Sequence, residues 1–294
     1  MSGMSKTSID FKSLARTLTI IENELDGADD ILRNLNFLQP VSVIGVTGPP
    51  GAGKSTLVNA LIDELSFNGK NIAVLAIDPT SPFNYGSLLG DRIRMNTQFN
   101  KDNVYIRSIA TRGSLGGLSG KTFEMADVLR SAGFDYIFVE TVGVGQSEVE
   151  IAGLADVTIV VLVPESGDEI QSMKSGLMEI ADVFVVNKAD RAGADDFANT
   201  LNKVINSNFK STPVIKTIAS TNSGISELLE SISHLESNTA QMKVTMLTDR
   251  AWRIIQQKRM ADIDKVMLKA DIQKICHETR FNLYAFIEKW LSNS

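Results

Sequence analysis

The hydrophobic positions of the chain fall into short, mostly β-branched runs that alternate with longer stretches of mixed polarity. Some of these runs are apolar throughout, as in Ile72-Ala73-Val74-Leu75-Ala76-Ile77. Strands of this kind are expected where helices cover both faces of a parallel sheet. The pattern therefore predicts strands over residues 41–47, 71–78, 103–109, 135–141, 157–163, 182–187 and 213–219.

The stretches between these strands are long enough to form crossover helices. The clearest of them cover residues 54–66, 121–132, 169–180 and 194–206. A regular alternation of strand and helix is typical of a doubly wound α/β domain, in which a mostly parallel sheet carries helices on both faces. We expect this domain to span residues 38–237.

The two flanking regions, residues 1–37 and 238–294, have a helical pattern. Phe11, Leu14, Leu18 and Ile21 have the spacing of an amphipathic helix, and residues 240–291 contain no proline and no strong strand run. We expect an N-terminal helical extension and a C-terminal region of two or three helices. The apolar positions of these regions either pack on the main domain or form an oligomer or partner surface, and the pattern alone is compatible with both.

The composition narrows the class of protein. Of the 294 residues, 43% are hydrophobic and 22% are charged, as in an ordinary globular protein. The net charge of −6 argues against broad electrostatic binding to nucleic acid or an anionic membrane, and no apolar run approaches the roughly 20 residues of a membrane span. The single cysteine, Cys276, excludes a disulfide scaffold and favours the cytoplasm, and the two histidines argue against a histidine-rich metal site.

The strongest chemical signal follows the first predicted strand. The segment Gly48-Pro49-Pro50-Gly51-Ala52-Gly53-Lys54-Ser55-Thr56 matches the phosphate-loop pattern G-x-x-x-x-G-K-[ST], and a predicted helix follows it, as the motif requires. Glycines let backbone N–H groups point at phosphate oxygens, and the helix N-terminus adds a positive dipole end. In this pattern Lys54 reaches the β- and γ-phosphates, and the hydroxyl of Ser55 ligates Mg²⁺.

A second motif, Asn187-Lys188-Ala189-Asp190, ends the predicted strand 182–187. The pattern N-K-x-D after a phosphate loop selects guanine, because an aspartate accepts hydrogen bonds from the N1–H and the 2-amino group, which adenine lacks. We assign this role to Asp190, with Asn187 orienting the loop and Lys188 lying along the base. A backbone N–H of Ala219-Ser220, at the end of the last predicted strand, is the candidate contact for the guanine oxygen.

Three acidic residues are candidates for holding Mg²⁺ opposite the phosphate loop. Asp78 and Glu140 each lie at the end of a predicted strand, and Asp91 lies between them in the sequence. Carboxylates are the usual protein partners of Mg²⁺ in phosphoryl transfer. The element Glu140-x-x-Gly143 is similar to the D-x-x-G of other GTPases, so we expect the N–H of Gly143 to sense the γ-phosphate. Structural roles, a turn cap for Asp78 and an ion pair for Asp91, stay open.

Together these motifs resemble the GTPases associated with methylmalonyl-CoA mutase, a family that has also carried the label of arginine/ornithine transport-system kinases. The resemblance covers roughly residues 10–237. The chain departs from the family pattern at Asn84-Tyr85 and at Ser119-Gly120. The segments that carry the resemblance are residues 48–56, 78–82, 86–95, 111–118, 140–148, 178–182 and 187–190.

The resemblance implies a G-protein chaperone of an adenosylcobalamin-dependent acyl-CoA mutase. Such a protein binds GTP or GDP with Mg²⁺ and hydrolyses GTP slowly alone and faster with its mutase. It gates cofactor delivery, and it protects or reactivates the mutase. A homodimer with C-terminal helices in the contact is also implied, and the loop 164–174 would sense the mutase. By matching position, catalysis and the metal would be served by Lys54, Ser55, Asp78, Asp91 and Glu140.

Two other classes of protein fit part of the pattern. A P-loop kinase acting on a protein or a small molecule would use the same phosphate and metal residues, but it would normally take ATP. A metal-delivery GTPase needs Cys and His clusters for its cargo, whereas Cys276 stands beside His277 alone. Nucleotide selectivity separates the first class from a GTPase, and a metal titration separates the second.

Overall fold

The structure is a computed structural model, which describes residues 9–37, 41–78, 98–110, 118, 120–141, 150–166, 175–208, 212–235, 240–260, 263–275 and 282–293. The chain divides into two compact units, Met1–Thr239 and Ala240–Ser294. The first unit contains the sheet, and the second is helical.

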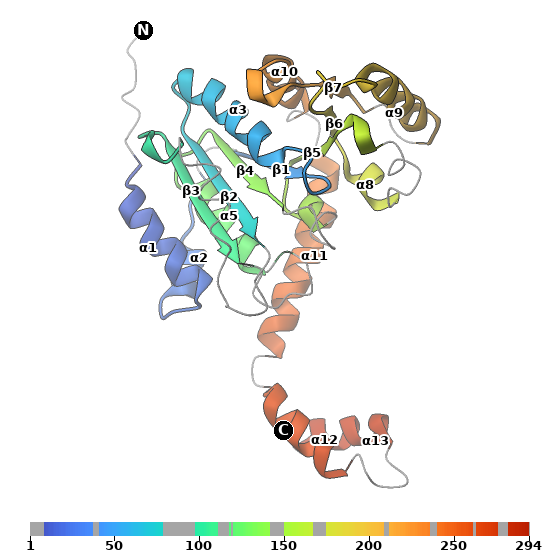
Figure 1. Ribbon diagram of the computed structural model, residues 1–294. Helices are drawn as coiled ribbons and strands as arrows, with labels where there is room; N and C mark the ends of the chain where they lie inside the picture. Colours follow the sequence, from blue (N-terminus) through green and yellow to red (C-terminus); the bar gives the residue numbers. More distant parts are fainter. Residues whose placement is uncertain are drawn as a thin grey trace. The chain divides into compact units, whose positions relative to one another are not determined.

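The described part of the first unit is built on a seven-stranded sheet with the order β3-β2-β4-β1-β5-β6-β7 (Figure 1). All its strand pairs are parallel, which confirms the predicted α/β class. From β1 the chain crosses to β2 on one side of the sheet, whereas from the neighbouring β5 it crosses to β6 on the other side. Open α/β sheets bind ligands at the carboxyl ends of two strands whose connections diverge in this way. The strands are β1 (Ser42–Thr47), β2 (Ile72–Asp78), β3 (Val104–Ala110), β4 (Tyr136–Glu140), β5 (Val157–Leu162), β6 (Val183–Val186) and β7 (Val214–Lys216).

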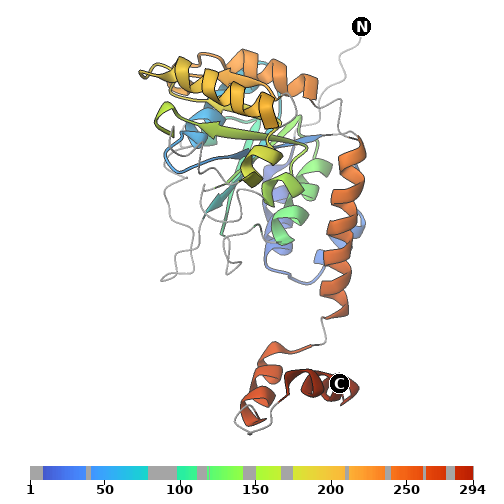
Figure 2. The ribbon, with the colours of Figure 1, turned by 90° about the vertical axis from the view of Figure 1, so that its right-hand side faces the viewer.

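Helices cover both faces of this sheet, as the apolar strands predicted. The pair α3 (Lys54–Phe67) and α10 (Ile225–Leu235) packs on one face. Figure 2 shows α3 and α5 on opposite sides of the strands. The other face carries α1 (Phe11–Glu22), α5 (Gly120–Ser131), α8 (Ser175–Ile180) and α9 (Ala194–Asn208). Single 3₁₀ turns lie at Gln98–Asn100, Ile151–Gly153, Pro164–Ser166 and Ala219–Thr221.

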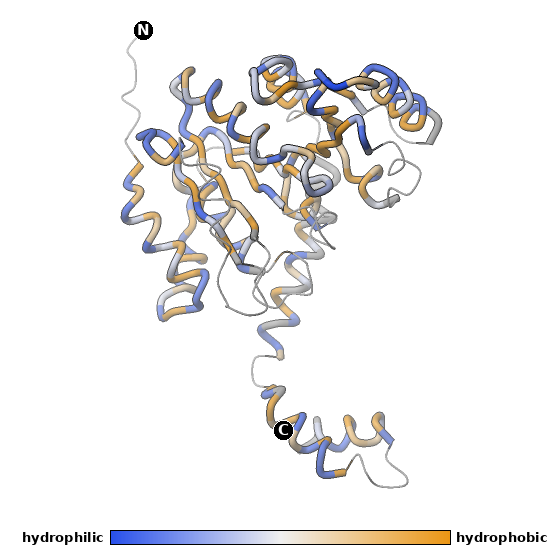
Figure 3. Tube along the Cα trace, viewed as in Figure 1, coloured by the Kyte–Doolittle hydropathy of each residue, from blue (hydrophilic) through white to orange (hydrophobic). Residues whose placement is uncertain are grey.

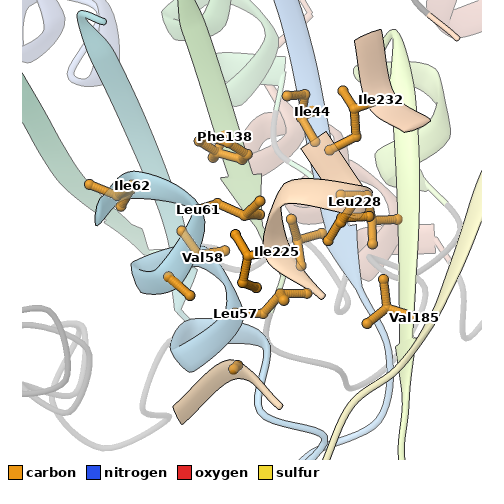
Figure 4. Close-up of a cluster of buried hydrophobic side chains, with 14 of the residues drawn as sticks. Ile44, Leu57, Val58, Leu61, Ile62, Phe138, Val185, Ile225, Leu228 and Ile232 are labelled. Atoms are coloured by element: carbon orange, nitrogen blue, oxygen red, sulfur yellow. The ribbon is translucent and has the colours of Figure 1, made fainter. Parts of the chain in front are cut away.

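The core beneath α3 fixes the start of that helix against the sheet. Figure 4 shows Leu57 and Leu61 of α3 close to Ile225 and Leu228 of α10, with Phe138 of β4 above Leu61 in this view. These side chains are fully buried, and burial of each stabilises the fold by about 1.5–3 kcal/mol. Hydrophobic residues follow the strands through the middle of the unit (Figure 3). The phosphate loop, which ends where α3 begins, is therefore anchored to a rigid element.

The predicted N-terminal helical segment consists of two helices, α1 and α2 (Ala28–Arg33). The carboxylate of Asp10 caps α1 by accepting hydrogen bonds from the backbone N–H groups of Lys12 and Ser13 at 3.0 and 3.1 Å. Between the helices, Glu24 and Gly27 adopt positive φ angles of 51° and 92°, and a left-handed residue interrupts a helix.

Helix α1 packs on the sheet. Its buried residues join the apolar cluster between α1, α5 and the face of the sheet opposite α3, which we call the second core. Arg107 of the edge strand β3 reaches across to α1. The guanidinium donates to Glu22 at 2.5 Å and to the carbonyl oxygen of Ala15 at 3.2 Å. Burial acts to lower the pKa of Arg107, but the hydrogen bonds to Glu22 and Tyr105 outweigh it and raise the pKa. For the N-terminal region, the structure thus selects the first of the two alternatives.

The last predicted strand is shorter than expected, since β7 ends at Lys216 and not at 219. Gly224, with φ 77°, brings the returning chain so close that a Cβ there would lie 2.2 Å from the carbonyl oxygen of Lys216. Ile218 also pairs with Ser223 in an antiparallel bridge. The chain therefore turns before 219, and Ala219 to Thr221 form a 3₁₀ turn that leads into α10.

The second unit, where it is described, contains α11 (Ala240–Arg259), α12 (Lys265–Ile275) and α13 (Leu283–Asn293), in agreement with the predicted two or three helices. Many of its described large apolar side chains are exposed to solvent in the single chain. Among the helices of the described ranges, none combines the length and the apolarity needed to cross a membrane. Among the described side chains of the unit, the most exposed apolar ones are Leu247, Trp252, Val266, Met267 and Tyr284.

Candidate functional site

The predicted phosphate loop connects β1 to α3 at the centre of the sheet. β1 ends at Thr47, and α3 begins at Lys54 with Gly53 as its N-cap residue. The strand, loop and helix therefore have the order that the motif requires. The backbone N–H groups at the start of α3 face a turn with no side-chain cap, which is the arrangement that binds phosphate.

Two glycines of this loop are required by close contacts as well as by backbone conformation. Gly48 has φ 136°, and a Cβ on it would lie 2.2 Å from the carbonyl oxygen of Val161 in β5. Gly53 has φ 88°, and a Cβ on it would lie 2.5 Å from Nδ2 of Asn187. The loop thus passes directly against β5 at one end and against the predicted guanine-selecting segment at the other.

The Gly48→Ala substitution is expected to lower the free energy of unfolding by about 2–5 kcal/mol, because the methyl group meets backbone that has no room to move. The matched control is Gly133→Ala, since Gly133 has φ 88° and open space around a Cβ. This control should cost only about 1–2 kcal/mol for the left-handed conformation. Urea denaturation measures both, and equal losses would contradict the close approach of Gly48 to Val161.

Lys54 lies inside the loop and is only 6% exposed. Its Nζ donates to the carbonyl oxygen of Gly48 at 2.8 Å and to that of Pro49 at 3.0 Å. The ammonium group therefore lies over the concave side of the loop, where phosphate oxygens are expected. Phosphate oxygens are stronger acceptors than neutral carbonyls, so a nucleotide can take over these hydrogen bonds.

Ser55 and Glu140 meet beside the loop, although they are far apart in the sequence. Oγ of Ser55 donates to Oε1 of Glu140 at 2.6 Å. Glu140 is the last residue of β4, it pairs in register with Val46 of β1, and it is 6% exposed. The structure therefore brings together two of the predicted metal ligands, a hydroxyl and a carboxylate.

The other predicted switch residues are only partly described. Asp78 is the last residue of β2, the strand beside β4, and its side chain lies outside the described part of the structure. The backbone of Asp78 lies at the carboxyl end of β2, and Glu140 lies at the carboxyl end of the neighbouring parallel strand β4. Asp91 and Gly143 lie outside the described residues, and their roles stay predictions.

The predicted guanine-selecting segment is tied directly to the phosphate loop. Nδ2 of the buried Asn187 donates to the carbonyl oxygen of Ala52 at 2.9 Å, and Nζ of Lys188 donates to that of Gly51 at 2.7 Å. Oδ1 of Asn187 accepts hydrogen bonds from Oγ1 of Thr217 at 3.1 Å and from the backbone N–H of Ala219 at 3.2 Å. All four hydrogen bonds join separate loops into one site.

Asp190 is exposed at the turn that follows this segment. Lys188 adopts φ 56°, a conformation that a residue with a side chain takes only in a specific turn. The next residue after Asp190, Arg191, forms an ion pair with Glu165, and this hydrogen bond lowers the pKa of Glu165. Because Ala219 donates its N–H to Asn187, the neighbouring Ser220 is the better candidate for the guanine oxygen.

Three buried threonines near the site carry no predicted role. Thr47 and Thr141 hydrogen-bond through their hydroxyls at 2.9 Å, and Thr217 donates to Asn187. All are at most 1% exposed. Each of them stands at or next to the end of a strand, and Thr47 and Thr141 directly adjoin the motif residues Gly48 and Glu140, so their position is the signal that the sequence offers. A hydroxyl buried there must find a partner, but the sequence does not say which one.

Comparisons with known proteins agree with this geometry. The profile of the family described as "Methylmalonyl Co-A mutase-associated GTPase MeaB" matches residues 14–274. A putative GTPase of Pyrococcus abyssi is 48% identical over 231 residues, which is 76% of this chain and 71% of the relative. The mouse protein named methylmalonic aciduria type A homolog, mitochondrial, is 44% identical over 147 residues, which is 50% of this chain and 35% of the relative.

A solved structure supports the fold. The crystal structure of an LAO/AO transport system kinase superimposes with a TM-score of 0.64 at 23% identity, over 95% of this chain and 92% of that one. The family profile covers most of the chain, and the relatives at high identity are named GTPases. This chain therefore belongs to the MeaB family of P-loop GTPases and binds guanine nucleotide.

Proposed function

We propose that this GTPase is a nucleotide-controlled chaperone of an adenosylcobalamin-dependent acyl-CoA mutase of the methylmalonyl-CoA mutase type. It would gate delivery of the cofactor, and it would protect or reactivate the mutase. The observation that carries the proposal is a phosphate loop bonded directly to a guanine-selecting segment, in a family described as associated with methylmalonyl-CoA mutase. A cytoplasmic location fits the single cysteine.

The described residues have separate tasks in this proposal. Lys54 moves its hydrogen bonds from the carbonyls of Gly48 and Pro49 to the β- and γ-phosphates, and the loop N–H groups hold the same oxygens. Asp190 selects the base, while Asn187 and Lys188 keep the base loop against the phosphate loop. Water attacks the γ-phosphate in line, and the charge that develops falls on groups that are already in place.

Magnesium is the metal that the donor set favours. The hydroxyl of Ser55 and the carboxylate of Glu140 are oxygen ligands, lie 2.6 Å apart and belong to rigid elements. We propose that these two groups hold Mg²⁺, with Asp78 and Asp91 as the further carboxylates near it. When bound, the metal would neutralise charge on the β- and γ-phosphates.

The chaperone role requires two states of the GTPase that the mutase distinguishes. A partner can shift such an equilibrium only by its different affinity for the two states. We propose that the N–H of Gly143 contacts the γ-phosphate and that the loop 164–174 contacts the mutase. Loss of the γ-phosphate then changes the surface that the mutase binds, which couples hydrolysis to cofactor delivery.

We propose further that the protein is a homodimer in which the C-terminal helices take part. The support is the concentration of exposed large apolar side chains on α11, α12 and α13, such as Trp252 and Tyr284. Apolar surface of this kind marks an interaction site more often than a free surface.

The test is steady-state hydrolysis of GTP and ATP by the purified protein, with and without a candidate adenosylcobalamin-dependent mutase. We expect slow, GTP-selective turnover that increases at least about tenfold when the correct mutase is added, a modest share of what partner proteins supply to other GTPases. A mutase whose cofactor site is already filled with adenosylcobalamin serves as the matched control for cofactor loading. Turnover unchanged by every mutase would contradict the chaperone role, and rapid ATP turnover would favour a kinase.

A further inference from the structure

A pair of buried hydroxyl groups lies where the phosphate loop and the metal-binding strand leave the sheet. Oγ1 of Thr141 donates to Oγ1 of Thr47 at 2.9 Å, and the backbone N–H of Thr141 donates to the carbonyl oxygen of Val46 at 3.0 Å. The two threonines are 94 residues apart and are 1% and 0% exposed. They form the last described link between β1 and β4.

The pair lies on the opposite face of the sheet from the proposed metal ligands. Val46 pairs in register with Glu140, and both face α3, from which Ser55 projects. One residue further along each strand, Thr47 and Thr141 face the second core. On that face the nearest positions along β1 and β4 are Gly45 and Val139, and the apolar Val43 and Ile137 lie beyond them, so a valine pair would suit the surroundings.

The contacts around this pair form a closed ring. Thr141 bonds to Thr47, which precedes Gly48; Gly48 accepts the hydrogen bond of Lys54, which precedes Ser55. Ser55 in turn bonds to Glu140, which precedes Thr141. The hydroxyl pair is therefore the one link of this ring that involves neither a phosphate-binding nor a metal-binding group.

We propose that Thr47 and Thr141 are positioning residues, whose hydroxyl-to-hydroxyl bond holds the carboxylate of Glu140 against Ser55 and thereby sets the affinity of the nucleotide-bound protein for Mg²⁺. The inference rests on the proposed function, since it takes Ser55 and Glu140 as metal ligands. Groups that orient ligands in this way typically change metal affinity by about 10–100-fold when they are lost.

The test uses the full chain with the variants Thr47→Val, Thr141→Val and the double variant. Affinity for a fluorescent GDP analogue is measured against Mg²⁺ concentration, and unfolding is measured separately. Each single variant should raise the half-saturating Mg²⁺ concentration by about tenfold or more, with affinity in EDTA unchanged. Each should also unfold more easily, because one buried hydroxyl has lost its partner.

The double variant separates positioning from stability. Two valines leave no unpaired hydroxyl, so the double variant should recover most of the stability yet keep the raised Mg²⁺ requirement. Thr141→Ser retains the hydroxyl and should bind Mg²⁺ like the unchanged protein. Thr158→Val is the control, since Thr158 is a buried threonine of β5 on the same face. Recovery of both stability and Mg²⁺ affinity in the double variant would overturn the inference.

Glu140→Gln distinguishes this inference from the proposed function. If Glu140→Gln leaves the half-saturating Mg²⁺ concentration unchanged, the assignment of Glu140 to the metal fails, and the role of the threonines fails with it. If Glu140→Gln raises that concentration and the threonine variants do not, the metal assignment stands and only the inference is wrong.

Discussion

The Lys54→Met variant is expected to hydrolyse GTP at least about a hundredfold more slowly than the unchanged protein, because removal of one preorganised charged donor from a phosphoryl-transfer site costs this much or more. The ammonium group of Lys54 is buried in the loop and donates to the carbonyl oxygens of Gly48 and Pro49, whereas Lys188 contacts the loop from the guanine-selecting segment, at Gly51. Methionine keeps the apolar stem of the side chain and removes the charged group at its end. Phosphate release under single-turnover conditions measures the effect.

Lys216→Met is the matched control for this experiment. Lys216 is an exposed lysine at the end of β7, where it pairs with Asp195, and it has no role in the proposed site. Its variant should hydrolyse GTP at the unchanged rate. Unfolding curves for both variants show whether the fold is intact. Turnover of a folded Lys54→Met variant within tenfold of the original would mean that the phosphates bind elsewhere.

The Asp190→Asn variant is expected to exchange guanine selectivity for xanthine selectivity. A carboxylate accepts two hydrogen bonds from guanine, one from N1–H and one from the 2-amino group. An amide accepts one hydrogen bond and donates the other, and xanthine presents a carbonyl oxygen where guanine has its 2-amino group. Affinity for GTP should fall at least about a hundredfold, because a donor then faces a donor, and affinity for xanthosine triphosphate should rise. Competition against a fluorescent guanine nucleotide measures all of these affinities, with ATP included.

Asp195→Asn is the control, since Asp195 is a strongly exposed aspartate at the start of α9, and its partner is Lys216. This variant should keep the affinity for GTP and should not gain affinity for xanthosine triphosphate. A loss of GTP binding by Asp190→Asn without any gain for xanthosine triphosphate would indicate damage to the loop, and Asp190 would then not be the residue that reads the base.

The strands and the phosphate loop were predictable because their signals are local. The apolar runs that became β1 to β6 are contiguous, and each ends within one residue of the expected end. The loop from Gly48 to Thr56 carries its chemistry in nine consecutive residues, and the guanine-selecting segment does so in four. The length of β7 was overestimated the most, because the close return of the chain at Gly224 is a contact between residues that the local pattern does not reveal.

The contacts that make these segments one site were not predictable. Ser55 and Glu140 are 85 residues apart, and Asn187 and Ala52 are 135 apart. These residues meet because the sheet has the strand order β4-β1-β5, and that order cannot be inferred from any local run of residues. The hydroxyl pair of Thr47 and Thr141 is hidden for the same reason, since threonine at a strand end is also an ordinary β-branched residue.

By itself, the sequence determined that this protein has a parallel α/β sheet, a phosphate loop and a guanine-selecting motif, because periodicity and short motifs act over neighbouring residues. Only the tertiary structure decided that α1 packs on the sheet through Arg107, that Lys54 bonds to the loop carbonyls, and that Glu140 meets Ser55. The physical reason is that these contacts depend on which elements bury their apolar faces against one another, and this packing is determined by the chain as a whole and not by any local segment.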